Sequence, residues 1–142
     1  MSRITLVQAN SIVAAALAKG AELGLKPLSV AILDSGGHLL AFQRADGSSM
    51  LRPQIAMAKA SGALALGISS RKIAEMAAER PSFVASLGSI APQGVVPAAG
   101  GIVVIDGDGA VIGAVGITGD TSDNDELCAL AGIAAAGLTP QG

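Results

Sequence analysis

The hydrophobic pattern of residues 102–118 predicts a β-hairpin at the centre of the fold. Residues 102–105 form an unbroken run of Ile and Val, residues 106–109 read Asp-Gly-Asp-Gly, and residues 110–118 form a second apolar run. β-branched residues favour strands, and the Asp/Gly segment supplies the positive φ of a tight turn. Because neither run alternates apolar with polar residues, both faces of the hairpin should be covered. We expect helices on one face and a second subunit on the other.

Two glycines within the second run mark a crowded place. Gly113 and Gly116 interrupt a stretch of Val, Ile and Ala. A glycine in a strand gives up packing and backbone entropy, and it is typical of places where another group approaches the backbone closely. A tightly packed helix and a bound ligand are the two explanations, and we favour the helix.

The pattern of the remaining chain predicts a second hairpin and a set of helices. Two apolar runs, 28–34 and 38–44, flank a Ser-Gly-Gly turn. The expected helices span residues 5–23, 53–66, 70–79, a short stretch from 82, and 122–137. Ser122 and Asp125 have the spacing of a capping box at the start of the last helix. Two hairpins in one mostly antiparallel sheet of four or five strands, with helices packed across it, make a single α+β domain over residues 1–142.

The composition favours a homo-oligomer. The chain is 51% hydrophobic and only 14% charged, whereas about 25% charged residues is typical of soluble domains. Too little charge is present to cover a monomer comfortably.

Charge and cysteine usage argue against several classes of partner. The net charge is −2 and the basic residues are scattered, so we expect no nucleic-acid partner. No apolar run is long enough to span a bilayer and the first residues lack the layout of a signal peptide, so we expect a cytoplasmic protein without a membrane partner. The single Cys128 and the spacing of His and carboxylates predict no metal site.

Lys59 and Asp125 are the candidate catalytic residues. Lys59 is the only charged residue within a helix of small apolar residues, and an inward-facing ammonium would be desolvated and equipped as a base, an anion anchor or a nucleophile. An exposed lysine that keeps the helix soluble is the alternative. Asp125 could act as a general base or pair with Lys59, or it could only favour the start of the last helix through the helix dipole.

Two further places could hold a ligand. Arg44, with Asp46 and Arg52 nearby in the sequence, could bind a carboxylate through its guanidinium fork, or could form a solvated ion pair. Gly100 and Gly101 end a loop rich in Gly and Pro that feeds the central hairpin, and long loops beside buried sheets frequently carry function.

Several short motifs, taken together and in order, resemble one protein family. They are Asp34-x-x-Gly-x-Leu-x-Ala-Phe-x-Arg44 with Asp46-Gly47, Lys59-Ala60, Gly100-Gly101, Gly113-Ala-Val-Gly-Ile-Thr-Gly119, Asn124-Asp125-Glu126 and Ala131-Gly132. The sequence resembles the GlcG/HbpS-type haem-binding family, which also occurs as the C-terminal domain of PduO-type cobalamin adenosyltransferases. The resemblance implies a profilin-like or roadblock-like antiparallel sheet flanked by helices, and an oligomer. It also implies haem as the class of ligand, although other members belong to small-molecule catabolism.

The resulting hypothesis is an oligomer that binds a small ligand, with haem or another tetrapyrrole as the ligand and a pocket near the subunit interface. The residues expected around the ligand are Lys59, Thr118, Asp125, Gly100, Gly101 and, as an anion clamp, Arg44. His38 is the only histidine, and the resemblance does not assign an iron ligand to its position. His38 and Thr118 are expected among the residues that contact the ligand, with Thr118 as a weak ligand for the iron. Aromatic residues that would line a haem slot are limited to Phe42 and Phe83.

Two other function classes remain open from the sequence. The first is a cofactor-free lyase, isomerase or hydrolase acting on a small organic acid, with Lys59 and Asp125 as an acid–base pair. The second is a structural or regulatory oligomer without a ligand.

Overall fold

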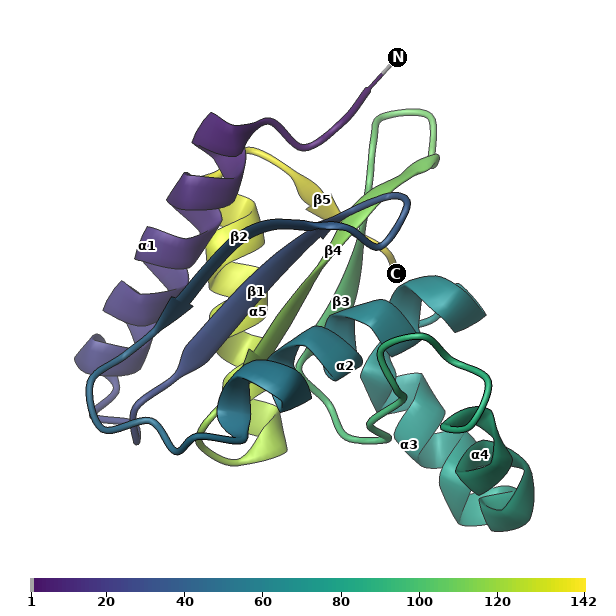
Figure 1. The fold of residues 1–142 in the computed structure, drawn as a ribbon. Coiled ribbons are helices and arrows are strands. Elements are labelled where there is room, and N and C mark those ends of the chain that lie inside the picture. Colours follow the sequence, from purple (N-terminus) through teal and green to yellow (C-terminus); the bar gives the residue numbers. More distant parts are fainter. Residues whose placement is uncertain (1) are drawn as a thin grey trace.

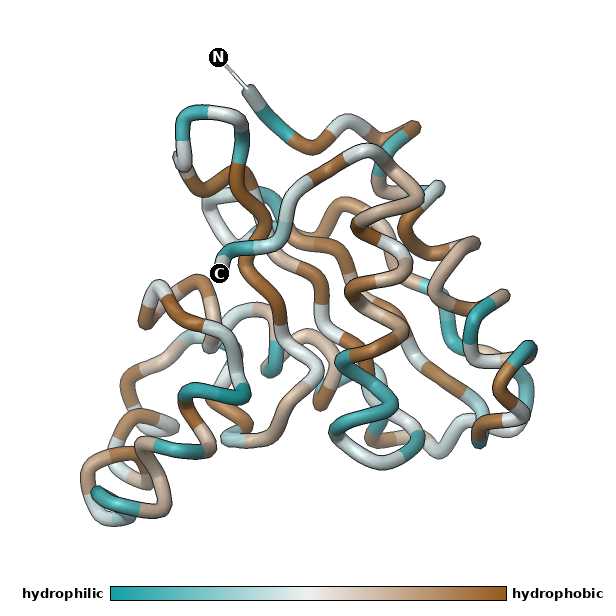
Figure 2. Tube along the Cα trace, turned by 180° about the vertical axis from the view of Figure 1, so that it is seen from behind, coloured by the Kyte–Doolittle hydropathy of each residue, from teal (hydrophilic) through white to brown (hydrophobic). Residues whose placement is uncertain are grey.

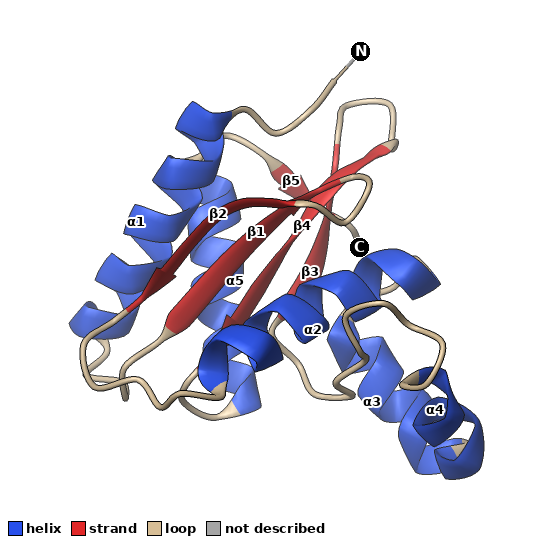
Figure 3. Cartoon of the chain, viewed as in Figure 1, coloured by secondary structure: helices blue, strands red, loops and turns tan. Residues whose placement is uncertain are grey.

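Five antiparallel strands form one sheet with helices on both of its faces (Figure 1, Figure 3). The computed structural model describes residues 2–142. The strand order is β2-β1-β4-β3-β5, so the two predicted hairpins join through β1 and β4. The strands are β1 (Ser29–Asp34), β2 (Leu39–Arg44), β3 (Gly101–Ile105), β4 (Val111–Thr118) and β5 (Thr139–Pro140). The α+β class, the single sheet and the central place of the 101–118 hairpin confirm the sequence prediction.

The helices belong to two layers and an outlying arm (Figure 1). On one face lie α1 (Leu6–Glu22) and α5 (Ser122–Ala135), and on the other lies α2 (Arg52–Leu66). The two remaining helices, α3 (Ser70–Glu79) and α4 (Pro81–Leu87), extend from α2 away from the sheet. The prediction that a second subunit covers one face of the hairpin was wrong, because α2 of the same chain covers it.

Glycines allow α2 to lie directly on the sheet. A Cβ atom added at Gly116 would overlap the Ala56 carbonyl oxygen, and one added at Gly101 would overlap the Lys59 carbonyl oxygen. The α2 residues that face the sheet are themselves small, and Ala56 and Ala60 are fully buried. A helix pressed on the strand therefore explains Gly116, as favoured from the sequence. Gly113 instead makes room for the β1 backbone at Leu33 and for a side chain of the N-terminal segment.

The main core lies between the sheet and the pair α1 and α5. Its largest members are aliphatic: Ile12, Val13, Ile32, Val115, Ile117 and Ile133. Figure 2 shows the central strands as the most continuous hydrophobic segments of the chain. Burying each such side chain contributes about 1.5–3 kcal/mol, so a chain without Trp or Tyr still builds a core.

The predicted element ends agree with the structure to within about two residues, with two exceptions. The short β5 pairs with β3 at Val104 and Ile105 and was not predicted. The capping box of Ser122 and Asp125 was wrong, since Thr121 is the N-cap and its hydroxyl accepts from the Asn124 amide at 3.2 Å. The Asp125 side chain instead turns into the protein and accepts from the amide of Asp120, the residue before the N-cap. Among the described residues, the helices are too short or too polar to cross a bilayer.

Candidate functional site

Lys59 and Asp125 meet in the interior, at the end of β4. The Lys59 Nζ donates to Asp125 Oδ2 at 3.1 Å and to the Ile117 carbonyl oxygen at 3.0 Å. The other Asp125 oxygen accepts from the Asp120 amide at 3.0 Å. The side chains of Lys59 and Asp125 are only 3% and 1% exposed. The pair thus ties α2 to α5 through the last residues of β4.

Burial shifts both members of this pair toward their neutral forms. Desolvation lowers the pKa of the Lys59 ammonium below its ordinary value, and the nearby Asp125 charge only partly opposes it. Desolvation likewise raises the pKa of the Asp125 carboxyl, while the Asp120 amide and Lys59 act in the opposite direction. Shifts of this kind are found both at catalytic sites and in structural ion pairs.

Gly100 and Gly101 close the loop over the ammonium. A Cβ at Gly100 would lie 2.5 Å from the Ile117 carbonyl oxygen and 2.9 Å from Lys59 Nζ, and its φ of +130° suits glycine. The Gly101 amide donates to the buried Ser70 hydroxyl at 2.7 Å, which fixes the loop to the start of α3. The two glycines therefore bring the backbone against Lys59 and shield it from solvent.

Thr118 lies beside the pair but is held by an arginine that the sequence hypothesis did not assign to it. Its hydroxyl accepts from Arg52 Nη1 at 2.8 Å, and the residue is 1% exposed. Arg52 stands at the first position of α2, so the loop before that helix brings it to β4.

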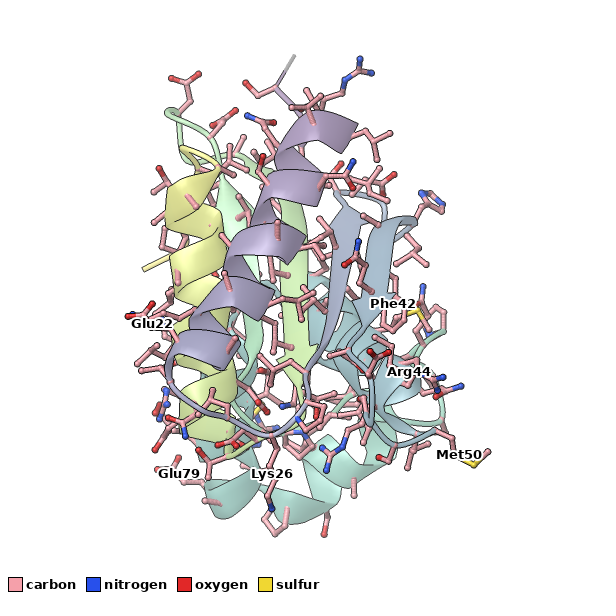
Figure 4. The ribbon with its side chains drawn as sticks, turned by 90° about the vertical axis from the view of Figure 1, so that its left-hand side faces the viewer. Glu22, Lys26, Phe42, Arg44, Met50 and Glu79 are labelled. Carbon is pink, nitrogen blue, oxygen red and sulfur yellow. The ribbon has the colours of Figure 1, made fainter. Side chains whose placement is uncertain are left out.

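Arg44 is not part of this group. It pairs with Ser29 of β1, and Ser29 in turn pairs with Thr118. Two strand spacings, about 10 Å, therefore separate Arg44 from Thr118. Figure 4 shows its side chain pointing outward on the same side as Phe42 and Met50.

His38 occupies a second, exposed place at the opposite end of the sheet. Its Nδ1 lies 3.2 Å from Asp34 Oδ1, with the His38 and Asp34 side chains 82% and 37% exposed. The same carboxylate accepts from the backbone amides of His38 and Gly36, each at 2.9 Å. The amide of His38 is the main cause that lowers the pKa of Asp34 below its ordinary value. The turn between β1 and β2 therefore holds an ionised carboxylate against the imidazole.

An open trough of about 560 Å³ lies beside this pair. It runs between the β1–β2 turn and the N-terminal segment, residues 3–6. Its lining includes His38 and Asp34, the aliphatic side chains of Ile4, Leu6 and Leu40, and the cationic Arg3.

The trough and the buried pair are separate sites. Asp34 pairs with Gly113 at one end of β1, and Ser29 pairs with Thr118 at the other. Five residues of β4 separate these two places, which corresponds to about 17 Å. Across residues 2–142, the structure contains no group of three or more His, Cys, Asp or Glu that could hold a metal ion by themselves.

Comparison with known proteins places the chain in a family. The model of the family described as haem degrading protein HbpS-like matches residues 4–134. The chain belongs to this HbpS-like family. Among curated relatives, an uncharacterized 15.0 kDa protein from the dhaT-dhaS intergenic region of Citrobacter freundii is 33% identical over 129 residues, which is 91% of this chain and 89% of that protein.

Solved structures of similar proteins share the HbpS-like fold. The PduOC:heme complex superposes with a TM-score of 0.88 at 23% identity, covering 99% of this chain and all of that one. Klebsiella pneumoniae ORFY has a TM-score of 0.86 at 28% identity, covering 96% and 93% of the two chains. HbpS has a TM-score of 0.80 at 29% identity, covering 94% and 90%.

Three residues near the two sites escaped the sequence hypothesis. Arg52 was considered only as part of a loop cluster, Asp34 only as part of a motif, and Arg3 not at all. For Asp34 a local signal exists, since a carboxylate four residues before the only histidine, across a Gly-Gly turn, can fold back onto it. Thr118, the partner of Arg52, is distant in the sequence, and Arg3 reaches the trough only through the fold, so no local pattern identifies either arginine.

Proposed function

We propose that this protein binds haem, or a closely related tetrapyrrole, in the trough beside His38. Two facts support haem as the ligand class: membership of the family described as haem degrading, and similarity over most of the chain to HbpS. The observation that carries the choice of site is the contact of His38 Nδ1 with Asp34. It leaves the other ring nitrogen, Nε2, without a protein partner among the described residues.

The His38 and Asp34 arrangement suits an iron ligand. Metal-binding histidines almost always donate the second ring N–H to a carboxylate or carbonyl, which fixes the tautomer and makes the free nitrogen more basic. His38 would hold the iron through Nε2, while Asp34 orients the ring. Bound haem would supply an iron centre for ligand binding and electron transfer.

The trough also suits the flat apolar part of the ligand. Its volume of about 560 Å³ falls within the range of about 300–1,000 Å³ that is typical of small-molecule sites. Leu6 and Leu40 would cover apolar ring edges. Thr118 is the less suitable ligand, because its hydroxyl is buried and engaged by Arg52.

A haemin titration of three proteins tests this assignment. The wild type and Thr118→Val should both develop a saturable Soret band, while His38→Ala should lose it or bind at least tenfold more weakly. His38 is exposed, so its removal should leave the fold intact, which circular dichroism checks. If His38→Ala binds haemin as the wild type does, the assignment is wrong.

We also propose that the protein forms a homo-oligomer. Several large apolar side chains remain exposed in the single chain: Val7, Met50, Leu51, Ile90 and Leu39. Leu39 lies on β2, an edge strand of the sheet. Native mass spectrometry of the purified protein should show a multiple of the chain mass, and a monomer at micromolar concentration would contradict the proposal.

A second candidate function rests on the contact between Lys59 and Asp125. Their 3.1 Å separation and opposite pKa shifts are features of acid–base pairs. The chemistry would be a cofactor-free reaction of a small organic acid, and the substrate would have to reach a pair that is almost fully buried. A thermal-shift screen of small mono- and dicarboxylic acids tests it: a hit that is lost in Asp125→Asn would support this candidate, and no hit would count against it.

A further inference from the structure

The N-terminal segment that walls the trough is anchored on the sheet by Ile4. This side chain is 3% exposed. Its Cδ1 lies 2.6 Å from the place where a Cβ of Gly113 would stand, so the missing side chain of Gly113 makes the seat for Ile4. Gly113 is the β4 partner of Asp34. The anchor therefore sits on the strand next to the carboxylate that holds His38.

A second contact fixes the segment just after Ile4. Thr5 caps α1 in a reciprocal box: its hydroxyl accepts from the Gln8 amide at 3.1 Å, and its amide donates to Gln8 Oε1 at 2.9 Å. Caps of this kind contribute about 1 kcal/mol and define the direction in which the chain enters the helix. Anchored by Ile4 and Thr5, the backbone of the preceding residue, Arg3, has a defined place.

This position of the backbone puts the cationic side chain of Arg3 at the rim of the trough. Arg3 lines both the trough with His38 and a neighbouring depression of about 440 Å³ that includes Asp106. Among residues 2–142, no carboxylate lies within ion-pair distance of Arg3. The Asp34 carboxylate in the same trough is already engaged by His38 and two backbone amides.

We infer that Arg3 selects tetrapyrroles that carry free carboxylates, and that Ile4 positions it for this role. The inference rests on the proposed haem site. A guanidinium presents paired N–H donors that match a carboxylate in a bidentate contact, and such charge-assisted contacts are stronger than neutral ones. Arg3 would take one propionate at the rim while the aliphatic lining covers the ring. Esterified or otherwise neutral tetrapyrroles would lose this contact.

The test compares a free acid with its ester. Haemin and haemin dimethyl ester are titrated into the wild type, Arg3→Gln and the control Arg44→Gln, which removes an exposed arginine on β2 outside the trough. The wild type and Arg44→Gln should prefer the acid by about tenfold, because a hydrogen bond to a charged group is worth at least that factor. Arg3→Gln should bind both compounds alike, with ester affinity unchanged.

Iron-free protoporphyrin IX separates this inference from the proposed function. Its binding, followed by fluorescence, does not use iron ligation, so His38→Ala should keep the acid preference that Arg3→Gln removes. If Arg3→Gln retains the acid preference while His38→Ala loses the Soret band of haemin, the role of Arg3 is wrong and the haem site stands. If His38→Ala binds haemin normally, the proposed site itself fails.

The positioning role of Ile4 has its own readout. Ile4→Ala keeps the guanidinium but removes the side chain that fills the seat on Gly113. It should weaken the binding of the acid severalfold and leave that of the ester nearly unchanged, in protein shown to be folded by circular dichroism. A general loss of affinity for both compounds would contradict the positioning role.

Discussion

Two pairs of acidic and basic side chains lie at opposite ends of the sheet, and the contact distances within the two pairs are similar. Lys59 and Asp125 are 3.1 Å apart with 3% and 1% of their side chains exposed. His38 and Asp34 are 3.2 Å apart with 82% and 37% exposed. The contact distances are nearly equal, and the surroundings are what differ.

The difference shows how burial decides what a charged pair can do. Asp125 and Lys59 use their polar atoms on each other, on the Ile117 carbonyl and on the Asp120 amide. Each charge has been taken out of water at a cost that only the complete set of partners offsets. His38 in contrast keeps one nitrogen open beside a trough. A buried pair such as Lys59 and Asp125 is suited to holding two helices together. An exposed pair such as His38 and Asp34 is suited to binding a ligand.

The largest expected effect comes from breaking the buried pair. Lys59→Met leaves the Asp125 carboxylate buried without its main partner, and should lower the free energy of unfolding by about 3–5 kcal/mol. Urea unfolding followed by circular dichroism measures it. The double variant Lys59→Met with Asp125→Leu should recover much of the loss, because no unpaired charge remains. A loss below about 1 kcal/mol in the single variant would contradict this account.

A smaller effect is expected from the glycine that lets the loop close on the pair. In Gly101→Ala the added Cβ overlaps the Lys59 carbonyl oxygen, and overpacking of this kind costs about 1–3 kcal/mol. Gly107→Ala is the matched control, since a Cβ there meets nothing within 4 Å. Thermal unfolding of both variants checks the prediction. Equal melting temperatures would show that the close approach of Gly101 to the Lys59 carbonyl does not require a glycine.

The exposed pair should respond in binding rather than in folding. Asp34→Asn removes the charged partner of His38 and should weaken haemin binding by about 10–100-fold, as for other carboxylates that orient metal-binding histidines. Asp46→Asn, a carboxylate outside the trough, serves as control. Soret titrations give both affinities. An unchanged haemin affinity in Asp34→Asn would mean that the Asp34 carboxylate does not strengthen the binding of iron by His38.

The smallest effect concerns acid stability near the buried pair. Hydrogen bonds from the Asn124 side chain and the Lys26 amide lower the pKa of Asp120 from 3.8 to about 2. Because the folded pKa is the lower one, the stabilisation is present above pH 3.8 and is lost as the pH falls toward 2. Asp120→Asn and Asn124→Ala should both flatten the fall of stability between pH 4 and pH 2, measured by urea unfolding. A slope identical to the wild type would contradict the assignment.

Much of the fold could be predicted because its signals are local. Apolar runs, the Asp-Gly-Asp-Gly turn and the capping residues lie within a few positions of the structure they specify. The covering of the second sheet face could not be predicted in this way. A helix as rich in alanine as α2 carries little amphipathic pattern, so the sequence does not show which surface it covers.

The candidate site was predicted in its members but not in its arrangement. Lys59, Asp125, Thr118, Gly100 and Gly101 do lie together. Arg44 and His38 lie elsewhere, because register in the sheet places Arg44 two strands away and His38 at the far end of β1. The catalytic or ligand-binding roles of all these residues stay predictions for the experiments above.

By itself the sequence determined the elements, their antiparallel connection and the family. Those properties depend on short-range backbone preferences and on motifs read in order. Only the tertiary structure decided that Lys59 points inward to a carboxylate 66 positions away, that Arg52 rather than Arg44 contacts Thr118, and that His38 faces a trough. These choices depend on strand register and on how closely a helix can lie on glycine, which only the packed chain establishes.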